Sequence, residues 1–270
     1  MTDQNSRHRT ALITGASSGL GREFARELAE CGYGLVLVAR RAERLAQLAA
    51  ELRQQYGVEA EVLEADLAQT GQLAAVEARL SDPAAPIDVL VNNAGIALRD
   101  RFHLGDIAEE QQMLSLNVVA VMRLTHAAIP GMIARGTGAI LNVSSVASFG
   151  PVSAGSTYAA TKAWVTNFSE SLHPVLTPHR VAIVALCPGF VHTEFHSRAG
   201  LSEGRQGNFW WLPAQRIARA GIRAVDADAG VLRARRPVVV PTLRYRAVAA
   251  LIRCLPRWML RIVSRRRGGL

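Results

Sequence analysis

The sequence predicts an α/β protein with a single Rossmann-type, doubly wound parallel sheet of about seven strands, helices on both faces and a basic amphipathic C-terminal extension. Short apolar runs alternate with longer segments of helical periodicity, which is the pattern of βαβ units. A glycine-rich turn directly follows the first apolar run. At 270 residues and 49% hydrophobic composition, the chain can bury one large core.

The first strands and helices follow one another closely. Residues 10–14 (TALIT) are expected to form a buried strand, and a helix is expected over 22–31 after the glycine-rich turn. Residues 34–39 (GLVLVA) form the second expected strand. The next segment, RRAERLAQLAAEL from Arg40, has the periodicity of a helix.

The rest of the chain continues the alternation. Further strands are expected at 89–93, 139–144, 181–186 and 238–240. Helices fill the gaps, notably 106–134 and 157–177. Strands that alternate with helices in this way belong to one parallel sheet.

The glycine-rich turn has the sequence Gly15-Ala-Ser-Ser-Gly19-Leu-Gly21 and lies between a strand and a helix. Gly15 permits a tight turn, Gly19 allows the backbone to approach a pyrophosphate, and Gly21 allows close packing of helix on strand. The free N–H groups at the start of the helix then face the phosphates. Glycine turns also occur for purely steric reasons, so the motif by itself leaves that alternative open.

The end of the second strand indicates which dinucleotide would bind. A carboxylate there would hold the ribose 2'-hydroxyl of NAD, but this chain has Ala39 followed by Arg40 and Arg41. Two guanidinium groups suit a 2'-phosphate, which predicts NADP(H). The alternative is that both arginines only open the next helix and are solvated.

The only lysine of the chain, Lys162, lies four residues after Tyr158, although 30 of the 31 basic residues are arginine. On a helix, this spacing places an ammonium beside a phenol. A nearby cation favours the phenolate and should lower the pKa of Tyr158, which would then serve as a proton shuttle. The alternative is a surface pair on an amphipathic helix.

With TGxxxGxG at Thr14–Gly21 and YxxxK at Tyr158–Lys162, the chain resembles the short-chain dehydrogenase/reductase family. The resemblance implies a catalytic set of Asn117 (in SLNVVA), Ser145 (13 residues before the tyrosine), Tyr158 and Lys162. It also implies that Asp66 contacts the adenine, that the NNAG segment 92–95 closes the fourth strand against the cofactor, and that Thr193 contacts the nicotinamide carboxamide. The motifs run in order from residue 14 to residue 193.

The cofactor-binding residues expected from the motifs and the resemblance are spread along the chain. They are Gly15, Ser17, Ser18, Gly19, Leu20, Gly21, Arg40, Arg41, Asp66, Leu67, Asn93, Ala94, Gly95, Tyr158, Lys162, Pro188, Gly189, Val191 and Thr193. The chain departs from many NADP-dependent relatives at Ser18, where they carry a basic residue.

The expected reaction is hydride transfer between NADP(H) and a carbonyl or secondary alcohol, and residues 1–240 are expected to form the dinucleotide-binding and catalytic domain. By resemblance, residues 194–213 form a substrate lid. The lid and its surroundings are rich in aromatic side chains: Phe195, Phe209, Trp210 and Trp211, with Phe149 and Phe190 nearby. These side chains favour an apolar substrate such as a steroid, a long acyl chain or an aromatic ketone. The tryptophans could instead only anchor the lid. A non-catalytic NADP(H)-sensing protein on the same fold is the alternative function.

The extension at 241–270 is strongly basic. Residues 231–270 hold 11 arginines and no acidic residue, which leaves 20 basic against 22 acidic residues in the first 230. One face of the expected helix carries arginines: Arg246, Arg253, Arg257, Arg261 and Arg265. The other face carries apolar residues: Val248, Leu251, Ile252, Leu255, Met259, Ile262 and Val263. Pro256 is expected to break the helix midway. Such an element could lie on an anionic membrane surface, or its apolar stripe could pack on the body or across a subunit interface. A nucleic-acid partner is not expected, because no recognition motif accompanies the arginines.

Three widely separated cysteines, Cys31, Cys187 and Cys254, predict free thiols in a reducing compartment. No signal peptide or apolar run near 18 residues is recognised, so a cytoplasmic protein is expected, peripheral on the inner face of the membrane if the extension binds lipid. His192 and His196 lack a matching ligand cluster, and no metal is expected. By resemblance, the helices at 106–134 and 157–177 would pair subunits in a homodimer or homotetramer.

Overall fold

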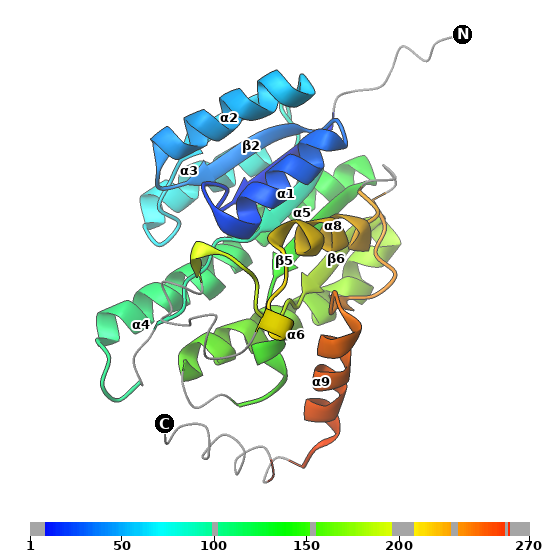
Figure 1. Cartoon of the computed structure of the whole chain (residues 1–270). Helices are drawn as coiled ribbons and strands as arrows, with labels where there is room; N and C mark the ends of the chain where they lie inside the picture. Colours follow the sequence, from blue (N-terminus) through cyan, green and yellow to red (C-terminus); the bar gives the residue numbers. More distant parts are fainter. Residues whose placement is uncertain are drawn as a thin grey trace.

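Seven parallel strands form one sheet between two layers of helices in the computed structural model (Figure 1). The structure describes residues 9–98, 102–151, 155–195, 208–227, 232–256 and 259. The strands are β1 (Thr10–Thr14), β2 (Gly34–Ala39), β3 (Ala60–Glu64), β4 (Val89–Asn92), β5 (Gly138–Val143), β6 (Val181–Leu186) and β7 (Val238–Val239). Their order across the sheet is β3-β2-β1-β4-β5-β6-β7, and all pairs are parallel. This confirms the predicted doubly wound sheet.

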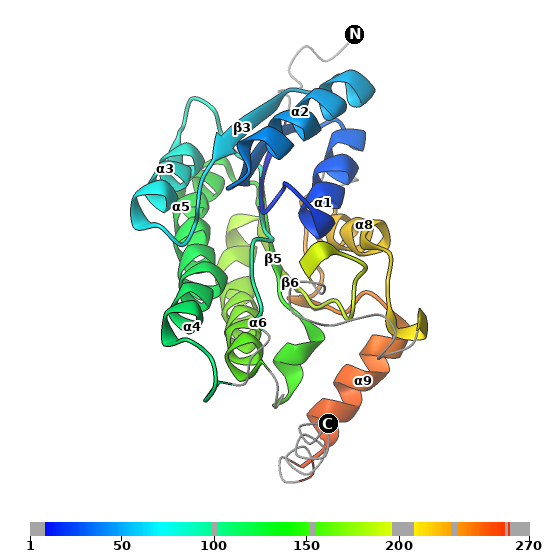
Figure 2. The ribbon, with the colours of Figure 1, turned by 60° about the vertical axis from the view of Figure 1, so that its left-hand side comes forward.

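The helices divide between the two faces of the sheet, as Figure 2 shows. One layer contains α1 (Gly19–Glu30), α2 (Ala42–Tyr56) and α8 (Ala214–Ala224); the other contains α3 (Thr70–Ser81), α5 (Ala120–Arg135) and α6 (Ser156–Leu176). Strand side chains alternate between the layers. Ile13 joins the buried cluster that includes Phe24 of α1, whereas its neighbour Leu12 joins the cluster that includes Leu124 of α5.

The order of the strands reverses beside β1. The chain moves outward from β1 to β2 and β3, and then returns to place β4 on the other side of β1. Leu12 of β1 therefore lies between Val36 of β2 and Leu90 of β4. In open parallel sheets, ligands bind beyond the carboxyl ends of the strands at such a reversal.

The boundaries of β1, β2 and β6 equal the expected ones, other boundaries differ by one to four residues, and β3 was not among the strands expected by range. The first helix begins at Gly19 rather than residue 22, because the last glycines of the turn already form its first helical turn. The fourth strand ends at Asn92, the fifth runs from Gly138 to Val143, and the seventh ends at Val239. These shifts leave every expected strand and helix in place.

The long helix expected at 106–134 has a change of pitch in its middle. It consists of α4 (Ile107–Leu114), a π-helical turn η1 (Ser115–Val119) and α5. Among the described residues, Ile107–Arg135 is the one helix whose length and mean hydropathy of 1.4 would suffice to cross a membrane, and 39% of its most apolar stretch is buried inside this fold. Its buried residues Leu124, Ala128 and Met132 pack in the core, which makes α5 a core helix of the sheet.

The C-terminal extension begins with α9 (Leu243–Cys254), which projects from the sheet layers in Figures 1 and 2. One side of α9 packs on the body through Tyr245 and Ala249, which are 3% and 5% exposed. The helix ends two residues before Pro256, as predicted. The expected apolar residues of α9 are not all alike, because Leu251 is 60% exposed whereas Val248 and Ile252 are half-buried. The expected tail residues Arg257, Arg261, Ile262, Val263 and Arg265 lie outside the described part of the chain.

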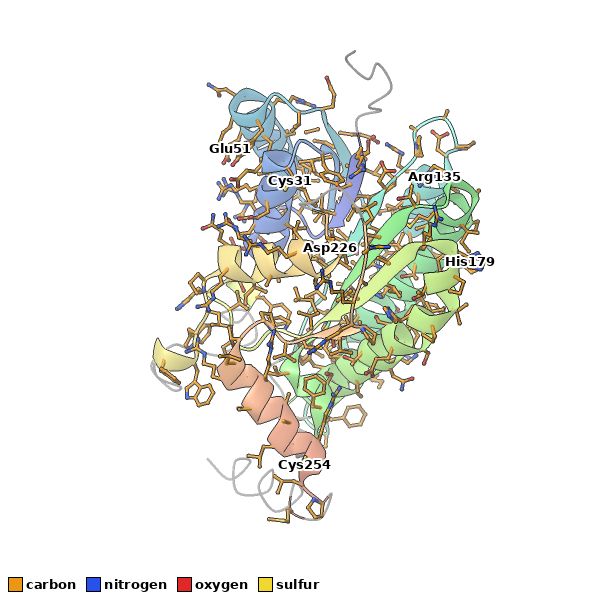
Figure 3. All side chains as sticks on the ribbon, turned by 90° about the vertical axis from the view of Figure 1, so that its right-hand side faces the viewer. Cys31, Glu51, Arg135, His179, Asp226 and Cys254 are labelled. Carbon is orange, nitrogen blue, oxygen red and sulfur yellow. The ribbon has the colours of Figure 1, made fainter. Side chains whose placement is uncertain are left out.

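The three cysteines lie far apart, and none of them forms a disulfide. Figure 3 shows Cys31 at the end of the molecule that also carries Glu51, and Cys254 at the tip of α9. Both are exposed, whereas Cys187 is buried at the end of β6.

Candidate active site

A cleft lies over the carboxyl ends of the strands, at the reversal between β1 and β4. Eighteen of the nineteen expected cofactor-binding residues line it, together with Ser145. They are Gly15, Ser17, Ser18, Gly19, Leu20, Arg40, Arg41, Asp66, Leu67, Asn93, Ala94, Gly95, Tyr158, Lys162, Pro188, Gly189, Val191 and Thr193. Thus the fold gathers segments from residue 15 to residue 193 around one space.

The remaining expected residue, Gly21, lies beneath the cleft. A Cβ atom at this position would lie 2.6 Å from Nδ2 of Asn93 and would overlap the carbonyl oxygen of Gly15. Gly19 adopts φ +54°, a left-handed conformation that glycine adopts without steric cost. The turn therefore needs glycine for its backbone path and for close packing of α1.

Thr14 joins the glycine turn to the segment after β4. Its hydroxyl accepts hydrogen bonds from the backbone N–H groups of Asn93 (2.9 Å) and Ala94 (3.0 Å). In return, Nδ2 of Asn93 donates to the carbonyl oxygen of Thr14 at 2.9 Å. The resemblance included Thr14 in its motif without a role; only the pairing of β1 with β4 shows that it holds two walls of the cleft together.

Arg40 and Arg41 lie at the rim of the cleft. Arg41 donates to the hydroxyls of Ser17 (3.3 Å) and Ser18 (3.1 Å), and Arg40 lies 4.0 Å from a carboxylate oxygen of Asp66. Arg41 also lies 3.6 Å from Glu194. Two cations and two hydroxyls at this end form a donor set with the chemistry to bind a phosphate.

Lys162 and Tyr158 meet at the other end. Both come from α6, and the Lys162 ammonium lies 5.8 Å from the centroid of the Tyr158 ring. Lys162 is 5% exposed and donates to the carbonyl oxygen of Val143 at 2.8 Å. Ser145 caps the short 3-10 helix η2 (Val146–Phe149), and its side chain hydrogen-bonds with Tyr158. The alternative of a surface pair is therefore wrong.

Burial governs the proton affinity of both groups. It raises the pKa of Tyr158 to about 12, against the lowering effect of the hydrogen bond with Ser145. It lowers the pKa of Lys162 to about 8. The expected direction for Tyr158 is therefore wrong in this structure, because transferring the phenol out of water disfavours the phenolate more than its polar neighbours favour it.

Asn117 lies behind the cleft in the π-helical turn η1 and is fully buried. Its side-chain oxygen accepts from the N–H of Ile96 (2.9 Å), and its amide nitrogen donates to the carbonyl oxygen of Ile96 (2.9 Å) and to Thr161 (3.2 Å). Asn117 therefore links the segment after β4 with α6, one residue from Lys162. The extra residue in the turn aims this side chain inward, which is a common use of π-helical turns.

The aromatic residues of the expected lid divide into two groups. Phe195 lines the cleft, with its ring centroid 5.8 Å from that of Tyr158. Two described segments, or stems, flank the rest of the lid: residues 189–195 and residues 208–212. Trp211 is 5% exposed and packs against Phe190 and His192, so it anchors the second stem on the first. Phe209 is 68% exposed. Expected lid residues 196–207, and His196 with them, lie outside the described residues.

Sequence reasoning also missed Ser144, the neighbour of Ser145. Its hydroxyl donates to the carbonyl oxygen of Lys162 at 2.8 Å and lies 2.7 Å from the hydroxyl of Thr166. It therefore fixes α6 against β5. In the sequence, Ser144 stands beside Ser145, and the distance of 13 residues to Tyr158 selected only Ser145 as a site residue. In the described part of the chain, no group of three or more His, Cys, Asp or Glu residues could hold a metal ion.

Comparison with known proteins gives a consistent result. The profile of a family described as short chain dehydrogenase matches residues 9–203. The chain is similar to the very-long-chain 3-oxoacyl-CoA reductase of Anas platyrhynchos, with 34% identity over 188 residues. That match covers 68% of the chain and 60% of the duck protein, so the chain spans less than two thirds of this relative.

Two solved structures are also similar. A short-chain dehydrogenase from Sphingobium yanoikuyae in complex with NADPH has 37% identity and a TM-score of 0.81, and the match covers 90% of this chain and 93% of that one. The bulky-bulky ketone specific alcohol dehydrogenase from Comamonas testosteroni has 31% identity and a TM-score of 0.75, with 92% and 95% coverage.

Proposed function

The chain belongs to the short-chain dehydrogenase family, and we propose that it is an NADP(H)-dependent oxidoreductase that reduces an apolar ketone to a secondary alcohol. One observation carries the proposal. The cleft has a phosphate-binding donor set with Arg40 and Arg41 at one end, and the Ser145, Tyr158 and Lys162 side chains at the other. The NADPH complex of the Sphingobium yanoikuyae relative supports this choice of cofactor.

The residues of the cleft suit NADP(H). Arg41, with Ser17 and Ser18 already hydrogen-bonded to it, would hold the 2'-phosphate together with Arg40. Asp66 and Leu67 would contact the adenine, the glycine turn would hold the pyrophosphate, and Val191 and Thr193 would contact the nicotinamide end. When bound, the cofactor supplies the hydride.

Side chains of the protein would carry out the proton transfer. In reduction, Tyr158 would give its phenolic proton to the carbonyl oxygen, and Ser145 would hydrogen-bond the same oxygen. Lys162 would hold the nicotinamide ribose and stabilise the phenolate as it forms. Asn117, one residue from Lys162 through Thr161, would support a water that returns a proton from solvent.

The substrate is proposed to be bulky and apolar. Phe195 beside Tyr158 provides an apolar wall next to the reacting groups. The names of two relatives, a very-long-chain 3-oxoacyl-CoA reductase and a bulky-bulky ketone specific alcohol dehydrogenase, support a ketone with a large apolar substituent. A non-catalytic NADP(H) sensor is the alternative; it would bind NADPH with no turnover.

We propose a cytoplasmic protein that contacts the membrane peripherally through α9. The outward side of α9 carries an apolar stripe of five exposed residues: Leu243, Ala247, Ala250, Leu251 and Cys254. The exposed Arg246 and Arg253 flank this stripe, and no acidic residue occurs after position 230. An exposed apolar stripe beside arginines suits the interface of an anionic bilayer.

The experiment for the proposed function combines cofactor binding with turnover. Fluorescence titration gives the Kd values of wild type, Arg41→Ala and Arg44→Ala for NADPH and for NADH. Arg44→Ala is the matched control, because Arg44 also lies near Glu194 but does not line the cleft. We expect Arg41→Ala to weaken NADPH binding about 10- to 100-fold and NADH binding little, because charge-assisted bonds to the 2'-phosphate are lost. Arg44→Ala should match wild type.

Turnover is then followed with bulky and small ketones. Wild type should oxidise NADPH with the bulky ketones, and Tyr158→Phe should reduce the rate about 10²- to 10⁴-fold, because the proton donor is removed. NADPH binding without turnover of any ketone would favour the sensor. A Tyr158→Phe variant as active as wild type would exclude the assigned proton donor.

A further inference from the structure

Helix α9 holds the loop that leads into the substrate lid. Tyr245 of α9 is 3% exposed, and its ring lies directly on Gly189, which lines the cleft. A Cβ atom at Gly189 would overlap that ring. The residues that follow Gly189 include Val191 and Thr193 of the cleft wall, so the tyrosine lies behind the wall at the reacting end.

The hydroxyl of Tyr245 connects the two ends of the lid. It accepts a hydrogen bond from the backbone N–H of Phe190 at 3.0 Å and donates one to the carbonyl oxygen of Trp210 at 2.7 Å. The two stems also pair directly, since the N–H of Leu212 donates to Phe190 at 2.9 Å and the N–H of His192 donates to Leu212 at 3.0 Å. One side chain of the C-terminal helix therefore joins the two stems that flank the lid.

The neighbouring residue extends this attachment. Arg244 donates to the carbonyl oxygen of Phe209 and, at 3.2 Å, to that of Trp211, and its guanidinium lies 4.8 Å from the ring centroid of Phe209. Together, Arg244 and Tyr245 bind three consecutive lid carbonyls. These bonds fix the short 3-10 helix η5 (Asn208–Trp210) and the residue that follows it, where backbone carbonyls at a helix end need partners outside the helix.

The other end of α9 reaches the opposite side of the site. The guanidinium of Arg253 lies 4.5 Å from the ring centroid of Phe149, the last residue of η2, which begins directly after Ser145. Arg253 also lies 3.9 Å from Glu170 of α6. α9 thus contacts the lid with its first turn and the Ser145 side with its last turn.

We propose that α9 is a brace that holds together the two described segments on either side of the lid, 189–195 and 208–212, and that Tyr245 is a positioning residue for the reaction. This inference rests on the proposed function, because it assigns the lid to a bulky ketone. Tyr245 touches none of the reacting atoms in this assignment; it acts through Gly189 and Phe190 on one stem and through Trp210 on the other. Bulky ketones should depend on the brace more than small ones, because the segment that follows Gly189 leads to Phe195, the apolar wall of the cleft beside Tyr158.

The test compares Tyr245→Phe with Tyr33→Phe. Tyr33 is a matched control, because it is 2% exposed and its hydroxyl donates to a backbone carbonyl, that of Ala227, at 3.1 Å, away from the lid. Tyr245→Phe should lower kcat/KM for a bulky ketone about tenfold, and for a small ketone less than about twofold, because two hydrogen bonds that fix the lid are lost. Tyr33→Phe should leave the ratio of the two values unchanged even if its Tm falls.

Hydrogen exchange gives a second readout that does not need turnover. In Tyr245→Phe, the backbone amides of Phe190, His192 and Leu212 should exchange faster than in wild type, and in Tyr33→Phe they should not. Unchanged exchange at these amides would overturn the brace. Faster exchange with an unchanged ratio of bulky to small kcat/KM would overturn the positioning role. If wild type reduces no ketone, the proposed function fails, whereas the exchange result still decides whether α9 fixes the lid.

Discussion

At the scale of single residues, the reacting end of the cleft combines a partly buried phenol with a buried ammonium. Burial raises the pKa of Tyr158 to about 12 and lowers that of Lys162 to about 8. Tyr158 is therefore a protonated acid throughout the neutral range, which suits a donor of protons in reduction. Alcohol oxidation, which needs the phenolate, should be the less favourable direction near neutral pH.

The lowered pKa of Lys162 predicts how activity varies with pH. As pH rises through about 8, Lys162 loses its proton and with it the charge proposed to hold the nicotinamide ribose, while Tyr158 stays protonated. The kcat/KM for NADPH, which reports groups of the free enzyme, should therefore fall between about pH 7 and about pH 9. Steady-state kinetics across this pH range measures this fall. A kcat/KM that does not change with pH would contradict the role assigned to the Lys162 charge.

The sequence allowed most site residues to be predicted, because their chemistry is visible in residue type and spacing. A lone lysine four residues after a tyrosine indicates a helical pair by its spacing alone. Thr14 and Ser144 could not be assigned in the same way. Their hydroxyls bind backbone groups of distant segments, and such partners are determined only when β1 meets β4 and β5 meets α6.

At the scale of elements, α9 shows why amphipathic patterns do not determine which face is buried. The extension has apolar residues on more than one side, and the expected apolar face, which includes Leu251, could have packed on the body or faced a membrane. In the structure, Tyr245 selects the packed side, because its ring fits Gly189 and its hydroxyl finds two backbone partners. Leu243 and Leu251 then face outward, at 78% and 60% exposure.

This outward stripe predicts binding to anionic lipid. Wild type should cosediment with vesicles of phosphatidylcholine and about one third phosphatidylglycerol but not with pure phosphatidylcholine, and salt should weaken the binding. The double variant Leu243→Glu and Leu251→Glu should bind at least about tenfold more weakly, because two apolar side chains are lost from the interface.

The control adds the same charge elsewhere. Gln111→Glu with Gln112→Glu places two acids on exposed positions of α4 and should retain vesicle binding. Equal binding by the α9 variant and wild type would argue against this face. A change of oligomeric state in the α9 variant without any vesicle binding by wild type would identify the stripe as a contact between copies of the chain.

The π-helical turn η1 is another feature that the sequence could not indicate. Residues 106–134 were expected to form one continuous helix, but the extra residue in η1 rotates the following side chains by about 100° relative to an unbroken α-helix. Its consequence is local and chemical: Asn117 is fully buried and holds both backbone groups of Ile96. The resemblance to the family, rather than periodicity, identified this residue.

At the scale of the whole molecule, the order of strands brings the site together. The return of the chain from β3 to β4 leaves the glycine turn after β1 and the Asn93–Gly95 segment after β4 side by side. Alternation of apolar runs and helices predicted the parallel sheet and six of its seven strands, but gave no range for the edge strand β3. The position of the lid and of α9 was beyond the sequence, since both depend on side-chain contacts across the finished fold.

The central claim is that hydride passes from NADPH to a ketone held beside Tyr158. The most direct measurement uses NADPH deuterated at both positions of nicotinamide C4, together with a bulky apolar ketone, and mass spectrometry of the product. The account predicts an alcohol that carries one deuterium on the former carbonyl carbon with wild type, and at least about a hundredfold less of it with Tyr158→Phe. Alcohol without deuterium, or no alcohol from any bulky ketone while NADPH binds, would contradict it.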